Sequence, residues 1–263
     1  TAAPFTSSSQ HGIATAPILL GMARKSQAHI VQTLLIIVIS SLMEGYDLFT
    51  RYDEDATESD RGVLVLYLVF GLVATGLSIG NDAEEILPTV KPNRSLFHPS
   101  LILSILSQVA THIGFTTLVT RAAKHGDRAD QKTILNTALL LLFLTQNIAT
   151  SLTNYAGRPF KLSIPDNTFL VAGMAGVMTI VFSGIGGLSG SLARYMKLTP
   201  LPDRLKKILT VAVCGELFGT FVLSRIAEAV FDLPRLEART APRPPWVTAK
   251  APAVDPWGMD GRP

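Results

Sequence analysis

Six apolar stretches of membrane-spanning length occupy most of this chain and leave only short loops between them. A helix needs about 20 residues to cross roughly 30 Å of hydrocarbon, and each stretch is close to that length. The stretches cover residues 26–45, 62–80, 99–119, 133–152, 167–190 and 208–231. The sequence therefore predicts an integral membrane protein, with no loop large enough to hold a nucleotide-binding or catalytic domain.

Charge is scarce along the whole chain: charged residues make up 16% and hydrophobic residues 48%, and the mean hydropathy is +0.34. A soluble domain usually carries about 25% charged residues. In lipid the backbone polar groups must be satisfied inside the spanning element, and continuous apolar runs favour helices over the alternating strands of a barrel. The predicted fold class is all-α, a polytopic six-helix transmembrane bundle.

Three regions are predicted along the chain: an N-terminal surface arm at 1–23, a six-helix transmembrane domain at 24–233, and a Pro-rich extended tail with Trp246 and Trp257 at 234–263. Such a tail cannot build a core of its own. We expect a neighbouring membrane-protein subunit to contact it. The lipid bilayer is the other expected partner, and the net charge of +3 gives no reason to expect nucleic acid. Lys and Arg are divided evenly between the two sides of the predicted membrane domain, so the positive-inside rule fixes neither orientation nor compartment.

Polar and ionisable side chains inside the predicted helices are the candidates for function, because such residues are costly in lipid. Glu216 lies nine residues before Arg225, on the opposite face of its helix, so its partner must come from another helix. Arg225 and Glu228 are three apart and are expected to pair. These side chains either line a polar substrate groove or join the helices, and we favour the second interpretation. The intramembrane polar candidates are Gln108, His112, Asn147, Glu216, Arg225 and Glu228.

No catalytic, cofactor-binding or metal-binding residue is predicted. The histidines show no HxxxH spacing, the single cysteine is Cys214, and no GxxxxGK phosphate loop is present. His112 follows Gln108 by four residues on the same helix face, and we expect a buried, hydrogen-bonded histidine there and not a metal ligand. The acidic loop 51–61 lacks the calcium-loop pattern and is interpreted as solvated.

One segment carries a recognisable pattern: residues 133–160, TILNTALLLLFLTQNIATSLTNYAGRPF. It resembles the eighth membrane helix of the P-type ATPases of subgroup five-A, the endoplasmic-reticulum transmembrane-helix dislocases. Residues 2–7, the Gln108/His112 pair and the Glu216/Arg225 pair resemble that family in the same order. The resemblance implies that the six spans correspond to the last six helices of the family. Its family-motif positions are Asn136, Ala149, Thr150, Asn154, Tyr155, Gly157, Pro159 and Phe160.

The chain also departs from that family. The phosphorylated aspartate of the family's DKTGT motif and its nucleotide site would lie N-terminal to Thr1. Asn147 stands where the family has Gln, the loop 80–92 is acidic where the family is basic, and the tail 234–263 has no counterpart. No catalytic residue can therefore be carried over.

Two hypotheses follow. In the first, the chain is a non-catalytic structural subunit derived from an ATPase membrane domain and built into a larger complex, such as a respiratory or ATP-synthase assembly of the mitochondrial inner or another organellar membrane. In the alternative, it is the transport-domain part of an active helix dislocase of the endoplasmic reticulum, with its catalytic domains outside this chain. We expect no enzyme activity from the chain by itself, and P-type ATPase activity only if it belongs to a longer polypeptide.

Overall fold

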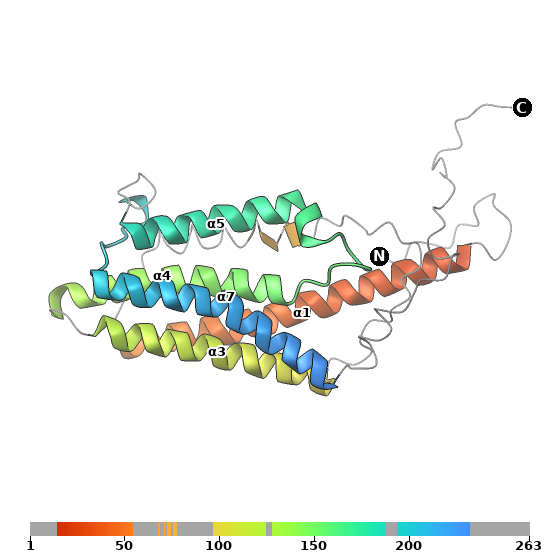
Figure 1. Ribbon diagram of the computed structural model, residues 1–263, viewed down its shortest axis with the longest axis horizontal. Coiled ribbons are helices and arrows are strands. Elements are labelled where there is room, and N and C mark those ends of the chain that lie inside the picture. The colour runs from red at the N-terminus through yellow and green to blue at the C-terminus, as the bar shows by residue number, and fades with distance from the viewer. Residues whose placement is uncertain are drawn as a thin grey trace, which may run out of the picture.

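The computed structural model describes residues 15–54, 97–124, 128–187 and 194–231, with six further positions between 68 and 77. These residues form five long helices and one short 3-10 helix, and no strand element (Figure 1). The all-α prediction is therefore confirmed for the described part of the chain. The elements are α1 (Thr15–Asp53), α3 (Pro99–Ala123), α4 (Arg128–Thr153), η1 (Ile164–Asp166), α5 (Thr168–Gly186) and α7 (Asp203–Phe231).

All five long helices are long and apolar enough to span a membrane. The sequence predicts six spans, and the difference falls on residues 62–80. Only Leu68, Gly71, Val73, Ala74, Gly76 and Leu77 of that stretch are described, and all of them are helical. The predicted tail 234–263 lies outside the described residues, and so does most of the acidic loop 51–61.

Helix α4 lies at the centre of the bundle. Of its apolar window, 78% is buried, whereas the other four helices bury only 22–33% of theirs. Its leucines Leu139, Leu141, Leu142 and Leu144 are almost completely enclosed. Helices α1, α3, α5 and α7 all pack against it (Figure 1).

Helices α3 and α7 run antiparallel and pack closely through a glycine. At Gly215 of α7, an added Cβ would lie 2.2 Å from the ring tip of Phe115 of α3, so the space of a side chain is already filled. One turn further, a Cβ at Gly219 would make an ordinary contact with Thr111 at 3.5 Å. Small residues four apart allow such close approach in lipid, and here the pair faces α3.

The distribution of side chains on α3 is reversed relative to a soluble helix. Its buried positions are mainly polar, including Gln108 and His112, while Leu103, Leu106 and Leu118 are exposed. A helix in water would bury the leucines, because exposed apolar surface is unfavourable there. A bundle surrounded by lipid gains nothing from burying leucine but must satisfy its polar groups internally. The burial pattern of α3 therefore supports the predicted membrane location.

Helix α1 is the longest element, with 39 residues. At 1.5 Å per residue it is about 58 Å long, well beyond the thickness of the hydrocarbon layer. Figure 1 shows its N-terminal part extending past the ends of the other helices. The helix begins at Thr15, within the stretch predicted as a surface arm, and residues 1–14 of that arm lie outside the described residues.

Candidate functional site: a polar layer between three helices

A row of polar side chains with a spacing of four residues follows the buried face of α3. Residues four apart share one face of a helix, so a repeated spacing of four builds a continuous stripe. Helices α4 and α7 carry matching rows on the faces that meet this stripe. The α3 row consists of Ser100, Ser104, Gln108, His112, Thr116 and Thr120; the α4 row of Gln146 and Thr150, continued by Asn154 directly after the helix; and the α7 row of Glu216, Thr220 and Ser224.

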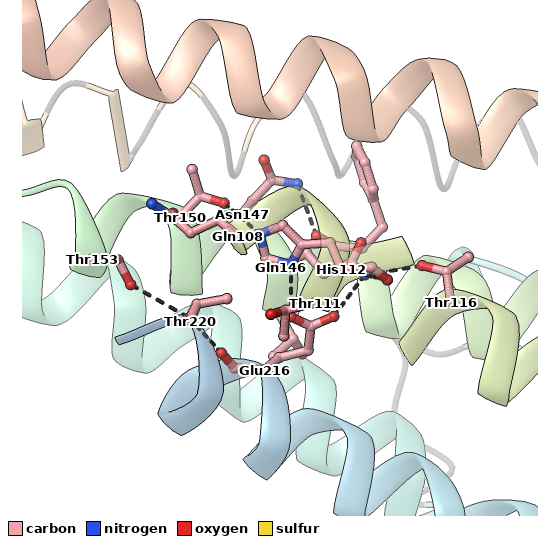
Figure 2. A network of polar contacts seen from close by, with 12 residues as sticks. Gln108, Thr111, His112, Thr116, Gln146, Asn147, Thr150, Thr153, Glu216 and Thr220 are labelled. Atoms are coloured by element: carbon pink, nitrogen blue, oxygen red, sulfur yellow. Dashed lines mark hydrogen bonds and ion pairs between the residues drawn. The ribbon is translucent and has the colours of Figure 1, made fainter. Parts of the chain in front are cut away.

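The centre of this layer is a contact between His112 and Glu216, two side chains that are completely buried. Nδ1 of His112 lies 2.6 Å from Oε2 of Glu216. The other ring nitrogen, Nε2, lies 3.1 Å from the hydroxyl oxygen of Thr150. The imidazole thus bridges α7 and α4 from its position on α3, as Figure 2 shows.

Gln146 of α4 completes the contact from the other side of the carboxylate. Its Nε2 donates to Oε1 of Glu216 at 2.8 Å and to Thr116 Oγ1 at 3.0 Å, and lies 3.3 Å from the backbone oxygen of His112 (Figure 2). Both oxygens of Glu216 therefore have a partner, one on α3 and one on α4. A buried carboxylate is tolerated only when such partners compensate for the water it has lost.

Further hydrogen bonds extend the layer toward the N-terminus of α3. Nδ2 of Asn154 donates to Oε1 of Gln108 at 2.9 Å and so joins the residue directly after α4 to α3. The hydroxyls of Ser104 and Ser224 lie 2.9 Å apart and join α3 to α7. Thr153 of α4 donates to the hydroxyl of Thr220 of α7 at 3.4 Å. All three pairs of helices in the layer are therefore connected directly.

The remaining polar candidates lie elsewhere. Asn147 accepts a hydrogen bond from Ser40 of α1 at 3.3 Å and bonds the Phe143 carbonyl, so it faces α1 and not the layer. Arg225 is exposed and lies over the ring of Phe221, 5.0 Å from its centroid. The side chain of Glu228 lies outside the described part of the chain, and with it the predicted pair with Arg225.

Asn136, at the opposite end of α4, takes part in a second buried polar contact. Arg51 of α1 donates through Nε to Asp47 Oδ2 at 2.6 Å and through Nη1 to the side-chain oxygen of Asn136. Asp47 and Arg51 are one helical turn apart, so the ion pair is formed within α1 and the amide links it to α4. This family-motif position therefore connects two helices.

Four of the other family-motif residues, Tyr155, Gly157, Pro159 and Phe160, lie in the turn from α4 to α5. Gly157 has φ +52°, a left-handed conformation that favours glycine. Its carbonyl accepts from the backbone nitrogens of Phe160, at 3.0 Å, and Lys161, at 2.8 Å. Tyr155 closes the turn by donating its hydroxyl to the carbonyl of Leu162 at 3.1 Å. Pro159, between them, follows a cis peptide bond.

This turn is fixed to the N-terminal half of α1. Phe160 is buried against Ala28, and the backbone nitrogen of Ala156 donates to Gln32 at 3.0 Å. Nζ of Lys161 lies 2.8 Å from Nδ1 of His29. On the exposed side of the turn, hydrogen bonding from Ser163, helped by the charge of Arg158, lowers the pKa of the Asp166 carboxyl. The family-motif residues of this turn thus fix its conformation and attach it to α1.

Gln146 and Thr150 are central to the layer, but sequence reasoning did not single them out as polar candidates. The signal that reveals them is the spacing: Gln146, Thr150 and Asn154 are each four residues apart, as are Gln108 and His112 on α3. Amide and hydroxyl side chains are a weaker sequence signal than charged side chains in a membrane helix, although they also form hydrogen bonds between helices.

The chemistry available in the layer is that of a hydrogen-bond network. Among the described residues, no group of three or more His, Cys, Asp or Glu could hold a metal ion. The fold and this layer define the class: a multi-pass helical membrane protein whose interior helices are joined by buried polar side chains.

Comparison with known proteins narrows this class. The chain is 27% identical over 240 residues to the endoplasmic reticulum transmembrane helix translocase spfA of Aspergillus fumigatus, and 26% identical over 229 residues to the endoplasmic reticulum transmembrane helix translocase of Saccharomyces cerevisiae. It is also 27% identical over 222 residues to the probable manganese-transporting ATPase PDR2 of Arabidopsis thaliana. These matches cover 88%, 84% and 80% of the chain, but only 18–19% of the relatives. The chain thus spans about one fifth of their length. No protein-family model matches it.

Proposed function

We propose that this chain is the C-terminal membrane part of a P-type ATPase of the helix-translocase type, located in the endoplasmic reticulum membrane. The observation that carries the proposal is the similarity to helix translocases along 84–88% of the chain. Of the two hypotheses from the sequence, the relatives support the dislocase; they give no support to a structural subunit of a mitochondrial or other organellar complex. ATP hydrolysis belongs to segments outside this chain, and the chain itself is not catalytic.

In this proposal the polar layer gives the membrane part its rigidity. His112 and Glu216, near the middle of α3 and α7, join these two helices to Gln146 in the C-terminal half of α4. Hydrogen bonds within a membrane are not replaced by water when a helix moves away, so separating these helices would leave buried polar groups without partners. The three helices therefore act as one body, against which other helices of the transporter can move.

The outer face of α1 is our candidate for contact with a transported helix. Ser40 contacts Asn147 and Arg51 contacts Asn136, so Glu44, between them on α1, lies at the level of the middle of α4. Glu44 is nevertheless exposed, as is Ser41 on the preceding turn. An acidic side chain facing outward at this depth needs a polar partner, and intramembrane acids of this kind mark transport paths.

The proposal is tested by isolating the polypeptide that contains this chain from membranes. A denaturing gel with mass spectrometry shows whether a DKTGT peptide belongs to the same polypeptide, and labelling with radioactive ATP shows whether that polypeptide forms an aspartyl phosphate. Both results are expected. A chain that runs near its own mass of 28.3 kDa when denatured, within a larger native complex and without such a peptide, would instead identify a structural subunit.

A further inference from the structure

The His112–Glu216 contact is the only place in the middle of α3, α4 and α7 where ionisable side chains of the described residues meet. Helix α5 contains no ionisable residue, and the charged residues of α3, α4 and α7 lie toward the helix ends. On α1, Asp47 pairs with Arg51, and Arg51 also donates to Asn136 of α4. The other ionisable residues of these helices are Arg24, Lys25, His29, Glu44, Tyr46, Tyr52, Asp53, Arg121, Arg128, Asp130, Lys132, Asp203, Arg204, Lys206, Lys207, Cys214, Arg225 and Glu228.

The net charge of the buried site determines how many protons the pair of side chains holds. An ionised Glu216 beside a neutral His112 would leave one uncompensated negative charge in a completely buried site, which is strongly unfavourable. One additional proton removes this cost in either of two forms: an imidazolium next to a carboxylate, or a neutral imidazole next to a carboxylic acid. Both forms are neutral overall, so the site is most stable when it holds one proton between its two members.

The hydrogen bonds locate that proton. Oε1 of Glu216 accepts from the amide of Gln146, so a proton on the carboxyl group lies on Oε2, facing Nδ1 of His112 across 2.6 Å. In both neutral forms Nε2 of His112 carries a hydrogen and donates it to Thr150 Oγ1. If the proton is lost, Nδ1 keeps the remaining ring hydrogen and Nε2 becomes an acceptor. The hydroxyl of Thr150 can serve either state, because it both donates and accepts.

We propose that His112 and Glu216 form a proton-binding site that retains one proton at neutral pH, and that the packing of α7 against α3 and α4 depends on keeping it. The proton is the ligand, and the atoms that bind it are Nδ1 of His112 on α3 and Oε2 of Glu216 on α7. Release leaves a buried carboxylate charge at the contact between these helices. The site is formed entirely by this chain, so its properties do not depend on the ATPase assignment.

The experiment is infrared and nitrogen-15 magnetic resonance spectroscopy on the full chain in lipid nanodiscs, with His11, His29, His98 and His125 replaced to isolate the signal of His112. At neutral pH the unaltered pair is expected to show either a doubly protonated imidazole or a protonated-carboxyl band from Glu216. A singly protonated imidazole together with an ionised Glu216 would overturn the proposal. Because this measurement leaves the pair intact, it does not depend on whether variants of the pair fold.

Variants of the two side chains test the protonation of Glu216 further. In His112→Asn the site can stay neutral only if Glu216 itself is protonated, so a protonated-carboxyl band is expected, and further replacement by Glu216→Gln should remove it. Asp166→Asn, at an exposed carboxyl outside the membrane helices, serves as the matched control and should leave this band unchanged. A His112→Asn protein that folds with a fully ionised Glu216 at neutral pH would also contradict the proposal.

Discussion

At the scale of single residues, the central feature of the bundle interior is the buried carboxylate of Glu216, which needs hydrogen-bond partners from neighbouring helices. Its carboxylate has no solvent access, and its two oxygens contact His112 of α3 and Gln146 of α4. Each partner is in turn held by a further hydrogen bond, the imidazole by Thr150 and the amide by Thr116. Removing the carboxylate would therefore leave the buried Nδ1 of His112 without its partner and take one acceptor from the amide of Gln146.

We predict that Glu216→Ala destabilises the bundle by about 3 kcal/mol or more, the usual consequence of removing one partner of a buried pair. The measurement is the free energy of unfolding in mixed detergent micelles, followed by circular dichroism. Cys214→Ala is the matched control, because Cys214 is exposed two residues away on the same helix, and it should change stability little. Equal stability of the two variants would show that the layer contributes little to holding the helices together.

A second prediction at this scale concerns the turn after α4. Gly157→Ala places a Cβ on a residue with φ +52°, which costs about 1–2 kcal/mol in the left-handed region. The turn should loosen its attachment to α1, and proteolysis near residues 155–163 should become faster. Gly176→Ala, at a helical glycine with open space around it, is the control and should leave the digestion pattern unchanged. Unaltered digestion of the Gly157 variant would contradict the prediction.

Part of the candidate site could be predicted from the sequence. The position of Glu216 relative to Arg225 on the helix indicated a partner on another helix, and the shared face of Gln108 and His112 indicated burial. The identity of the partners could not be predicted, because it depends on how α3, α4 and α7 are rotated against one another. Asn147 and Arg225 show the same difficulty: both are polar residues in membrane helices, but one faces α1 and the other is exposed.

At the scale of helices, the approach of α7 to α3 depends on one missing side chain. Gly215 lies directly under the ring of Phe115, next to Glu216 in the sequence, so the glycine allows the carboxylate to reach His112. Gly219, on the same face one turn later, has more room, with Thr111 at an ordinary contact distance. The two glycines look equivalent in the sequence, and only the structure distinguishes them.

We predict that Gly215→Ala destabilises the bundle by about 1–3 kcal/mol, because the added methyl group must displace a ring from a well-packed site. Gly219→Ala should change stability by less than half of that amount. Both are measured as unfolding free energies under identical micelle conditions. A larger effect at Gly219 than at Gly215 would mean that α3 and α7 pack in a different register.

At the scale of the whole molecule, the bundle is built around α4 and exposes apolar side chains on its outer surface. Membrane-length apolar stretches were sufficient to predict the helical fold and five of its helices in the described residues, because lipid leaves few other options. They could not predict the arrangement of the helices. In lipid no difference in hydrophobicity drives one helix against another, so the arrangement depends on small residues and polar contacts whose partners lie far away in the sequence.

The antiparallel arrangement of α3 and α7 leads to the last prediction. Ser104 and Ser224 are separated by 120 residues in the sequence, yet their hydroxyl oxygens lie 2.9 Å apart. In a Cys214→Ser background, the double variant Ser104→Cys/Ser224→Cys should therefore form a disulfide under mild oxidation. A protease site introduced into 188–193 makes the bond visible, because the two fragments stay joined on a non-reducing gel.

The pair Ser104→Cys/Thr210→Cys is the control, since Thr210 lies fourteen residues before Ser224 on α7, about 21 Å along the helix axis. Only the first pair should become cross-linked, and it should do so equally in the isolated chain and in any longer polypeptide that contains it, because the contact is formed within this bundle. Cross-linking of the control pair alone would require α7 to run parallel to α3. Cross-linking of neither pair would place α7 away from α3, and with it Glu216 away from His112.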